Sequence, residues 1–249
     1  MEFFKPAPPR VLAHRGLAIE APENTLLAFA KALAMGVTHI ETDVHASVDG
    51  VAVIAHDDTL ERVAGRKVRV DQLTMAELRR VDLGEGQGFC SLADALDAFP
   101  DARFNIDLKS AASVQPTVEV IREHRAEQRI LLASFSDRRR RVALNQLPGV
   151  ATSLSASGTM RLVAANRARL TSVERRILSP VHAVQIPERQ KGVRILTPRL
   201  ISAAHASAVE VHVWTVNEPD DMRRLLALGV DGLVTDRADL AVEVLKKHG

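Results

Sequence analysis

Acidic residues close two successive apolar runs in the first half of the chain. Glu41 and Asp43 stand two residues apart, so a β-strand would place both carboxylates on one face. Asn105, Asp107 and Lys109 repeat this spacing in the next apolar run. Carboxylates that gather at one place repel each other unless a cation or basic groups compensate their charge. Because its charged donors are oxygen atoms, the set suits a hard divalent cation such as Mg²⁺, Ca²⁺ or Mn²⁺ better than zinc.

Histidines and basic residues stand beside these carboxylates. His14 and Arg15 end the first apolar run, and His56 lies just beyond the second. Two histidines could serve as general acid and general base near neutral pH. Arg15 and Lys109 could hold a phosphate group, the arginine through its planar guanidinium. A divalent cation, two histidines and fixed positive charges are together the components of phosphodiester cleavage.

Each of these residues also has an ordinary interpretation. A histidine at a strand end is commonly a hydrogen-bonded structural residue, and a Glu-x-Asp pair is commonly an ion-paired strand end. Trp214, which ends a later apolar run, fits a large packing residue as well as a contact for substrate. The combination at one place is what favours a catalytic site.

Short apolar runs alternate with helical patterns along the whole chain. We predict strands at Val11–His14, Thr38–Val44, Arg103–Leu108, Ile130–Phe135, Val150–Leu154, Ala183–Ile186, Glu210–Thr215 and Gly232–Thr235. We predict helices at Pro22–Met35, Ser91–Phe99, Val114–His124, Asp137–Leu147, Thr159–Leu170, Pro198–Ala208, Pro219–Leu228 and Leu240–Lys247. Eight βα units predict an α/β fold of the TIM (β/α)₈ barrel class, in which the chemistry lies where the strands end. An open doubly wound sheet is the alternative, but His14-Arg15-Gly16 stands where its glycine-rich phosphate turn would be.

One connection is longer than a barrel needs. It runs from about Ala46 to Gly88, with a predicted hairpin at Ser47–His56, a turn at Gly65 and a short helix at Met75–Val81. A connection of this length in a compact fold is usually functional. No linker rich in glycine, serine or proline divides the chain, so we expect one barrel domain over residues 1–249 with this insertion inside it.

Composition narrows the classes of function. The formal net charge is only +2 over 249 residues, so a nucleic acid, which binds through many clustered positive charges, is not an expected partner. Arg138 to Arg141 form one dense basic cluster, which we interpret as the solvated start of a helix, with a local carboxylate or a partner subunit to neutralise it. Cys90 is the single cysteine, and residues 1–10 lack a signal-peptide core. Since no apolar run reaches about 18 residues either, we expect a cytoplasmic protein without a transmembrane segment.

A set of short motifs resembles one known family, the glycerophosphodiester phosphodiesterases of the bacterial cytoplasmic type. The early motifs are His14-Arg15-Gly16, Pro22-Glu23-Asn24-Thr25, Ile40-Glu41-Thr42-Asp43-Val44, Asp49-Gly50 and His56-Asp57. The later ones are Asn105-Ile106-Asp107-Leu108-Lys109, Ser134-Phe135, Trp214-Thr215-Val216-Asn217, Gly229-Val230-Asp231-Gly232 and Thr235-Asp236. The resemblance runs from about Val11 to Leu240 and is specific, because the early motifs occur in a fixed order.

The resemblance implies a barrel with a small subdomain inserted between strand two and its helix. It implies hydrolysis of glycerophosphodiesters to sn-glycerol 3-phosphate and an alcohol, with the glycerol 2-hydroxyl as nucleophile and a cyclic phosphate that water opens. An internal hydroxyl is already in position, which makes this route favourable. By analogy with the family, His14 and His56 are the acid/base pair, Arg15 and Lys109 contact the phosphate, Glu41, Asp43 and Asp107 bind one divalent cation, and Trp214 contacts the substrate.

Two positions depart from the family pattern. The family usually has glutamate at the place of Asp107, so here the third ligand is one methylene shorter, and the cation would shift, bind through water or be held more weakly. Ser47 replaces a threonine before the Asp-Gly turn and keeps the hydroxyl. His45 shares strand parity with Glu41, but we expect the strand to end before it. His212 is interpreted as a barrel-interior residue.

Two other functions stay open. A phospholipase D-type enzyme acting on lysophospholipids would need an apolar entrance for an acyl chain, whereas only 3% of the residues are aromatic. A non-catalytic barrel that binds phosphorylated metabolites would not need both His14 and His56. The sequence does not indicate the headgroup preference or the oligomeric state.

Overall fold

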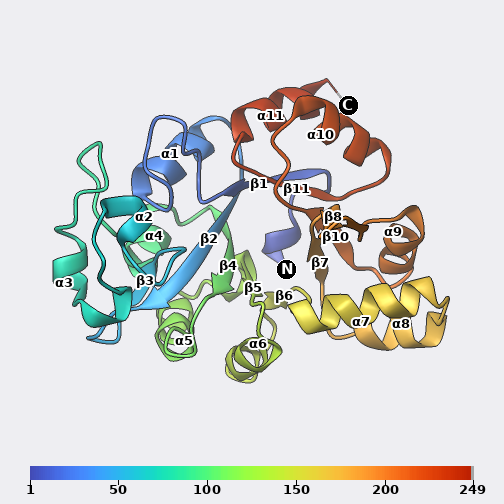
Figure 1. Ribbon diagram of the computed structural model, residues 1–249, viewed down its shortest axis with the longest axis horizontal. Helices are drawn as coiled ribbons and strands as arrows, with labels where there is room; N and C mark the ends of the chain where they lie inside the picture. Colours follow the sequence, from blue (N-terminus) through green and yellow to red (C-terminus); the bar gives the residue numbers. More distant parts are fainter. Residues whose placement is uncertain (248–249) are drawn as a thin grey trace.

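The protein forms a barrel of parallel strands surrounded by helices (Figure 1). The structure is a computed structural model that describes residues 1–247. Over this range the parallel strands of the barrel follow the order β6-β5-β4-β2-β1-β11-β10-β7, and a bridge between Ser153 and Ala183 connects the two ends. The barrel strands are β1 (Arg10–His14), β2 (His39–Ala46), β4 (Arg103–Leu108), β5 (Ile130–Ala133), β6 (Ala151–Thr152), β7 (Ala183–Ile186), β10 (Glu210–Val213) and β11 (Gly232–Thr235). The predicted (β/α)₈ class is confirmed.

Helices cover the outside of the barrel, and several begin at a hydroxyl side chain. The covering helices are α1 (Leu26–Ala34), α4 (Leu92–Ala98), α5 (Val114–Glu123), α6 (Asp137–Leu144), α7 (Ala156–Arg167), α8 (Thr171–Leu178), α9 (Pro198–His205), α10 (Pro219–Ala227) and α11 (Ala238–Lys246). Thr25, Ser91, Ser136, Ser155 and Thr197 each accept a backbone N–H of the first turn that follows. Such caps satisfy backbone donors that have no partner within the helix.

The structure differs from several of the predicted elements. The helix predicted from Pro22 begins only at Leu26, because Asn24 has a positive φ of 57° and Thr25 is the N-cap. The helix α8 was not predicted. The segment 187–194, for which we predicted neither a strand nor a helix, holds a small hairpin, β8 (Arg189–Gln190) with β9 (Val193–Arg194).

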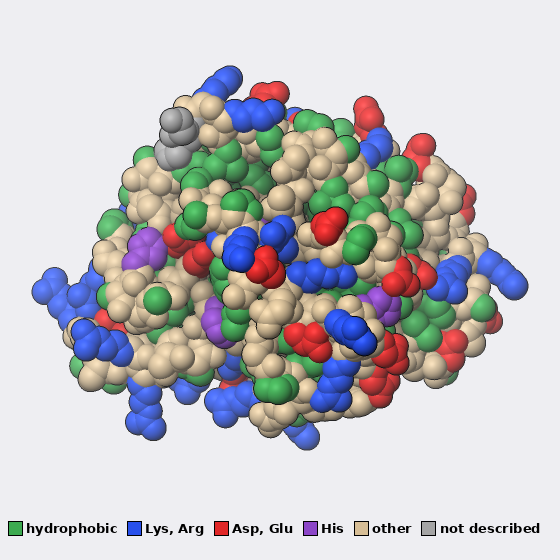
Figure 2. Space-filling model, turned by 180° about the vertical axis from the view of Figure 1, so that it is seen from behind, with side chains coloured by type: hydrophobic (Ala, Val, Ile, Leu, Met, Phe, Trp, Pro, Cys, Tyr) green, Lys and Arg blue, Asp and Glu red, His purple; other side chains and the backbone are tan. Residues whose placement is uncertain are grey.

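The basic cluster at the start of α6 is less exposed than predicted. Asp137 contacts Arg140 at 2.9 Å and Arg141 at 2.8 Å, which confirms the expected local carboxylate. Arg140 is buried, however, because its guanidinium reaches inward to the hydroxyl of Thr152. Figure 2, which shows the molecule from behind, has acidic and basic side chains interspersed. No helix within residues 1–247 is both long and apolar enough to span a bilayer.

The insertion between β2 and α4 forms a lobe at one side of the barrel (Figure 1, left). Its strand β3 (Ala52–Ile54) pairs antiparallel with the end of β2, and α2 (Glu61–Ala64), the 3₁₀ turn η2 (Val70–Gln72) and α3 (Met75–Leu78) follow. The lobe has an apolar cluster of its own, made of Val53, Ala55, Leu60, Val70, Met75, Leu78, Val81 and Phe89. Burial of this cluster stabilises the lobe.

The segment before β1 closes the opposite end of the barrel from the site described below. The 3₁₀ turn η1 (Glu2–Phe4) places Phe3 in a fully buried cluster with Leu12, Leu131, Ala151, Ala183 and Val234. The N-terminus accordingly lies near the centre of Figure 1. Arg10 makes a bidentate pair with Glu210 at 2.6 and 2.9 Å, so charges at the starts of β1 and β10 compensate each other.

Candidate active site

A cavity of about 330 Å³ opens where the barrel strands end. It is lined by all of the predicted site residues, His14, Arg15, Glu41, Asp43, His56, Asp107, Lys109 and Trp214, together with Asn105. Within a (β/α)₈ barrel this is the end at which active sites occur. The structure therefore brings together residues that come from β1, β2, β4, β10 and the insertion.

The turn after β1 is shaped by a close approach to α1. A Cβ atom at Gly16 would lie 2.7 Å from the backbone carbon of Ala28, so only glycine fits there. The approach brings Asn24 against β2, where its side-chain amide donates to Asp43 Oδ2 at 3.1 Å and accepts from the hydroxyl of Thr42 at 2.8 Å. The early motifs thus pack the turn after β1 against α1 and hold the carboxylate of Asp43 in place.

His14 is held by a residue from the other end of the chain. Its Nδ1–H donates to Asp236 Oδ1 at 2.6 Å, and Asn217 donates to the other oxygen of Asp236 at 2.8 Å. The Nε2 of His14 lies 3.9 Å from Glu41 Oε2. Burial alone would lower the pKa of His14, but the hydrogen bond to Asp236 and the charge of Glu41 raise it above its usual value. We predicted no role for Asp236 from the sequence, although it stands in one of the motifs.

His56 reaches the cavity from the insertion. Its Nδ1–H donates to Asp57 Oδ1 at 2.6 Å. His14 and His56 therefore share one arrangement, in which a carboxylate binds Nδ1 and leaves Nε2 for another partner. A carboxylate in this position selects the tautomer and orients the imidazole ring.

The carboxylates of the cavity are buried and interact strongly. Burial, and after it the negative charge of Asp43, raise the pKa of Glu41 to about 8. Burial would also raise the pKa of Asp43, but the charge and hydrogen bond of Lys109 lower it. A further cation beside Glu41 would relieve the repulsion that disfavours its ionised form.

Lys109 bridges two of the carboxylates. Its Nζ lies 2.8 Å from Asp43 Oδ1 and 2.8 Å from Asp107 Oδ2. Burial would lower the pKa of Lys109, but these two charges outweigh burial and raise it, so the ammonium stays charged. Arg15 adds a second cation, with Nε 3.4 Å from Asp43 Oδ2 and Nη1 3.0 Å from Glu23 Oε1.

Several buried oxygen atoms of the cavity lack a hydrogen-bond partner. Glu41 Oε2, Asn105 Oδ1 and Asp107 Oδ1 are buried and accept no hydrogen bond. Buried oxygens normally have a partner, so three such atoms beside one cavity suit a hard cation. As the side chains stand, no three His, Cys, Asp or Glu residues within residues 1–247 form a ready metal site. Lys109 Nζ lies between Asp43 and Asp107, so a cation ligated by both carboxylates would displace it.

The structure also places His45, Ser47 and His212, which were interpreted from the sequence. The prediction that β2 ends before His45 was wrong, because pairing with β3 extends the strand to Ala46. His45 nevertheless contacts the backbone carbonyl of His56, at 3.2 Å, and does not line the cavity. The hydroxyl of Ser47 accepts the N–H of Val51 at 2.9 Å and holds the Asp-Gly turn. His212 is fully buried inside the barrel, as predicted. His248 lies outside the described residues.

Part of the cavity lining is apolar. Trp214 packs edge-on against Phe135, with ring centroids 6.3 Å apart, and both line the cavity. Trp214 is therefore a packing residue and a wall of the cavity at once. Phe135 and Met160 remain 57% and 59% exposed.

Comparison with known proteins gives a consistent result. The sequence model of the glycerophosphoryl diester phosphodiesterase family matches residues 14–240. A Mycobacterium tuberculosis protein named Probable glycerophosphodiester phosphodiesterase 2 is 41% identical over 100% of this chain and 95% of its own length. A crystal structure from Silicibacter pomeroyi superposes with a TM-score of 0.82 at 27% identity, covering 98% of this chain and 95% of that one. An Oleispira antarctica phosphodiesterase, solved with its product sn-glycerol-3-phosphate, has the same fold, with a TM-score of 0.79 at 24% identity, and covers 96% and 97%.

The family match spans nearly the whole barrel, and the mycobacterial relative aligns with the chain from end to end. This chain therefore belongs to the glycerophosphoryl diester phosphodiesterase family and is a phosphodiester hydrolase.

Proposed function

We propose that this chain hydrolyses glycerophosphodiesters to sn-glycerol 3-phosphate and an alcohol, with His14 and His56 as acid and base. The observation that carries the proposal is the paired arrangement of the two histidines. Each has Nδ1 bound to a carboxylate, Asp236 or Asp57, and both side chains line the cavity that holds Arg15 and Lys109. Family membership supports the substrate class, and the geometry supports the roles.

The chemistry assigns one proton transfer to each histidine. One Nε2 takes the proton of the glycerol 2-hydroxyl as its oxygen attacks phosphorus, and the protonated Nε2 of the other gives a proton to the departing alcohol oxygen. The cyclic phosphate then opens when water, losing a proton to one imidazole, attacks phosphorus and the 2-oxygen regains a proton. Proton transfers of this kind typically accelerate a reaction by about 10²–10⁴-fold.

The charged residues would hold the phosphate. Arg15 and Lys109 carry fixed positive charges at the cavity, and either can bind a non-bridging phosphate oxygen. Glu41, Asp43 and Asp107 would hold one divalent cation, Mg²⁺, Ca²⁺ or Mn²⁺, and Asn105 offers a further oxygen. When bound, that cation would supply positive charge against the oxygens of the phosphate. A cytoplasmic location also stays a proposal, supported by the single, buried Cys90.

Product identification tests the proposed activity directly. The purified protein is incubated with several glycerophosphodiesters and titrated Mg²⁺, Ca²⁺ or Mn²⁺, and the products are separated by mass spectrometry. We expect free alcohol and sn-glycerol 3-phosphate in equal amounts. Release of glycerol and a phosphorylated alcohol instead would overturn the proposed bond cleavage. Binding of the diesters without turnover would favour the non-catalytic barrel.

The apolar part of the cavity lining favours one second candidate, hydrolysis of lysophospholipids by a phospholipase D-type reaction. Phe135 and Met160 are exposed at the cavity, and an acyl chain could cover them. The test compares glycerophosphocholine with lysophosphatidylcholine for the native chain and for Phe135→Ser with Met160→Ser. Loss confined to the lysophospholipid would support this candidate, and equal rates in both proteins would exclude it.

A further inference from the structure

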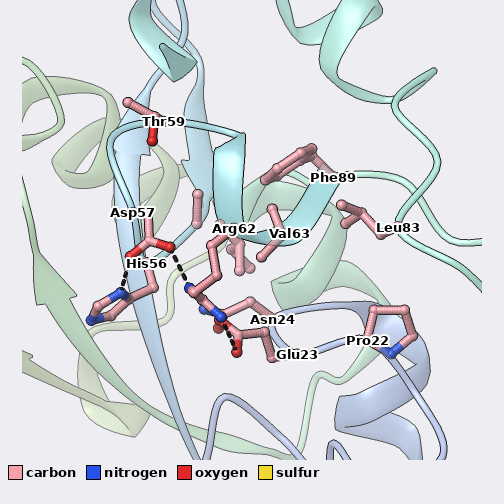
Figure 3. Close-up of a pocket in the computed structure, with 12 residues that line it drawn as sticks. Pro22, Glu23, Asn24, His56, Asp57, Thr59, Arg62, Val63, Leu83 and Phe89 are labelled. Carbon is pink, nitrogen blue, oxygen red and sulfur yellow. Dashed lines mark hydrogen bonds and ion pairs between the residues drawn. The ribbon is translucent and has the colours of Figure 1, made fainter. Parts of the chain in front are cut away.

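Arg62 is an arginine of the insertion that contacts two carboxylates on different parts of the fold (Figure 3). It lies in α2, and its Nε donates to Asp57 Oδ2 at 2.6 Å. Its two terminal nitrogens form a bidentate pair with Glu23, at 2.6 and 2.9 Å. Glu23 belongs to the barrel segment before α1, whereas Asp57 belongs to the insertion. The guanidinium therefore connects the insertion with the barrel.

Each of these carboxylates also holds a residue of the active site. The second oxygen of Asp57 binds His56 Nδ1 at 2.6 Å. Glu23 Oε1 accepts from Arg15 Nη1 at 3.0 Å, and Arg15 in turn faces Asp43 at 3.4 Å. An unbroken series of contacts thus runs from His56 through Arg62 to Arg15.

Arg62 itself lies outside the active-site cavity. It lines a neighbouring cavity of about 250 Å³ between the insertion and the barrel, and His56 is shared by both cavities. Figure 3 shows Asp57 between His56 and Arg62, so the guanidinium faces the carboxylate and not the free edge of the imidazole. Any effect of Arg62 on the reaction must therefore pass through the residues that it holds.

We propose that Arg62 is a positioning residue, which sets the relative placement of the acid/base residue His56 and the phosphate-binding residue Arg15 across the junction of insertion and barrel. Its planar guanidinium has donors for both carboxylates at once, which a lysine ammonium does not offer in the same fixed geometry. The roles of His56 and Arg15 rest on the proposed function, whereas the contacts of Arg62 do not.

The chain offers a matched control for this residue. Arg69 is also in the insertion, its side chain is 48% exposed against 49% for Arg62, and it too contacts two carboxylates, Asp58 at 2.7 Å and Asp71 at 2.9 Å. Arg69 does not line the active-site cavity. Exposed ion pairs contribute little to stability, so Arg62→Met and Arg69→Met should lower the melting temperature by similar, small amounts.

Steady-state kinetics should separate the two variants. With glycerophosphocholine as substrate, we expect Arg62→Met to lower kcat/KM by about 10–100-fold, since a displacement of roughly 1 Å of a reacting group can cost about 10²-fold. Arg69→Met should stay within about twofold of the native chain. Arg62→Lys should restore part of the loss. Equal kcat/KM for Arg62→Met and Arg69→Met would overturn the proposal.

A double-mutant cycle tests whether the effect passes through His56. If it does, adding Arg62→Met to His56→Ala should cost clearly less than the same change costs in the native chain. A full, additive loss would show that Arg62 acts elsewhere and would contradict the proposal. If Arg62→Met does not fold, Glu23→Gln removes the same bridge from its barrel side and takes its place in the cycle.

Nitrogen NMR of the imidazole side chains gives a readout that does not depend on activity. The His56 signal, assigned by its loss in His56→Ala, should report a proton on Nδ1 in the native chain. Arg62→Met should shift it toward a mixture of tautomers or broaden it, whereas Arg69→Met should not. An unchanged signal would overturn the proposal. If the native chain cleaves no glycerophosphodiester while the signal still changes, the proposed function fails and the positioning contact stands.

Discussion

Two histidines with the same local arrangement dominate the candidate site at the scale of single residues. His14 and His56 each donate Nδ1–H to a carboxylate at 2.6 Å, and each lines the cavity. The two carboxylates come from unrelated places, the end of β11 for Asp236 and the insertion for Asp57. Two separate segments thus each supply a carboxylate that orients an imidazole. An acid/base pair requires such orientation of both rings.

Removal of either imidazole should therefore be costly to the reaction but not to the fold. We expect His14→Ala and His56→Ala each to lower kcat by about 10²–10⁴-fold. Steady-state kinetics with each purified variant measures this, with circular dichroism as the control for folding. The double variant should lose less than the two single losses combined, because both groups act on one reaction path. Near-normal turnover in both single variants would contradict the assignment.

Asp107 decides how the proposed cation is held. One of its oxygens binds Lys109 at 2.8 Å, and the other is buried without a partner. If the free oxygen is a ligand, Asp107→Ala should weaken cation affinity strongly and Asp107→Glu should retain or tighten it. Calorimetric titration of Mg²⁺, Ca²⁺ or Mn²⁺ into chelator-treated protein measures both. Unchanged affinity in Asp107→Ala would mean that Asp107 serves only Lys109.

Chelation tests the cation itself. Exhaustive treatment with a chelator should abolish hydrolysis, and added Mg²⁺, Ca²⁺ or Mn²⁺ should restore it, because the proposed ligands are all carboxylates. The treated protein should keep its circular dichroism spectrum, which separates loss of the ion from loss of the fold. Full activity in protein shown to contain no metal would remove the cation from the proposal.

At the scale of elements, the sequence predicted what is locally encoded. The strands Arg103–Leu108, Ala183–Ile186 and Gly232–Thr235 have the predicted bounds, because a short segment rich in apolar residues encodes each of them. The helix α8 was not predicted, because the burial of one of its charged residues depends on a contact with a neighbouring helix. Its Glu174 is buried and accepts from Asn166 of α7 at 2.8 Å, a contact that makes a charged residue part of the core.

In the candidate site, too, features encoded locally in the sequence could be predicted, whereas contacts between distant residues could not. Residues whose parity or motif marks them, such as Glu41, Asp43 and Asp107, could be predicted, and they line the cavity. The supporting pairs could not. His14 and Asp236 are 222 residues apart, and Arg62 and Glu23 are 39 apart, so only the folded barrel brings them together. Sequence spacing carries no signal for such contacts.

The contribution of the turn η1 to the free energy of unfolding can be measured. Phe3 is fully buried against side chains of several barrel strands, so the segment before β1 acts as part of the core. Phe3→Ala should lower the free energy of unfolding by about 3–5 kcal/mol, the usual cost of a large buried truncation. Urea unfolding measures this, with Phe135→Ala as a control on an exposed ring. A loss below about 1 kcal/mol would show that the segment is only loosely attached.

At the scale of the whole molecule, the two ends of the barrel differ in their use of charge. At the end with the cavity, buried oxygens of Glu41 and Asp107 lack partners. At the other end, Arg10 and His39 are satisfied by Glu210 and by the backbone of the N-terminal segment. In a (β/α)₈ enzyme one end of the barrel serves stability and the other carries the active site. The paired charges at one end and the unpaired oxygens at the other agree with this division.

This second end should make the whole barrel sensitive to acid through His39. Its Nε2–H donates to the carbonyl of Phe3 at 2.6 Å, and the hydroxyl of Thr38 approaches Nδ1 at 2.9 Å. Burial, together with the positive charges of Arg10 and Arg103, lowers the pKa of His39 from 6.5 to about 3. The folded protein therefore resists the protonation that the unfolded chain accepts.

The lower pKa of His39 in the folded protein determines how stability changes with pH. The contribution of a neutral His39 is complete above the unfolded pKa of 6.5 and is lost as the pH falls toward about 3. Between pH 7 and pH 5 it amounts to about 2 kcal/mol of unfolding free energy. His39→Gln keeps a donor for Phe3 but cannot be protonated, so its loss between these pH values should be smaller by about that amount. Urea unfolding at both pH values measures the difference, with the exposed His205→Gln as control. Parallel losses in the native chain and in His39→Gln would show that another group governs the acid sensitivity of the barrel.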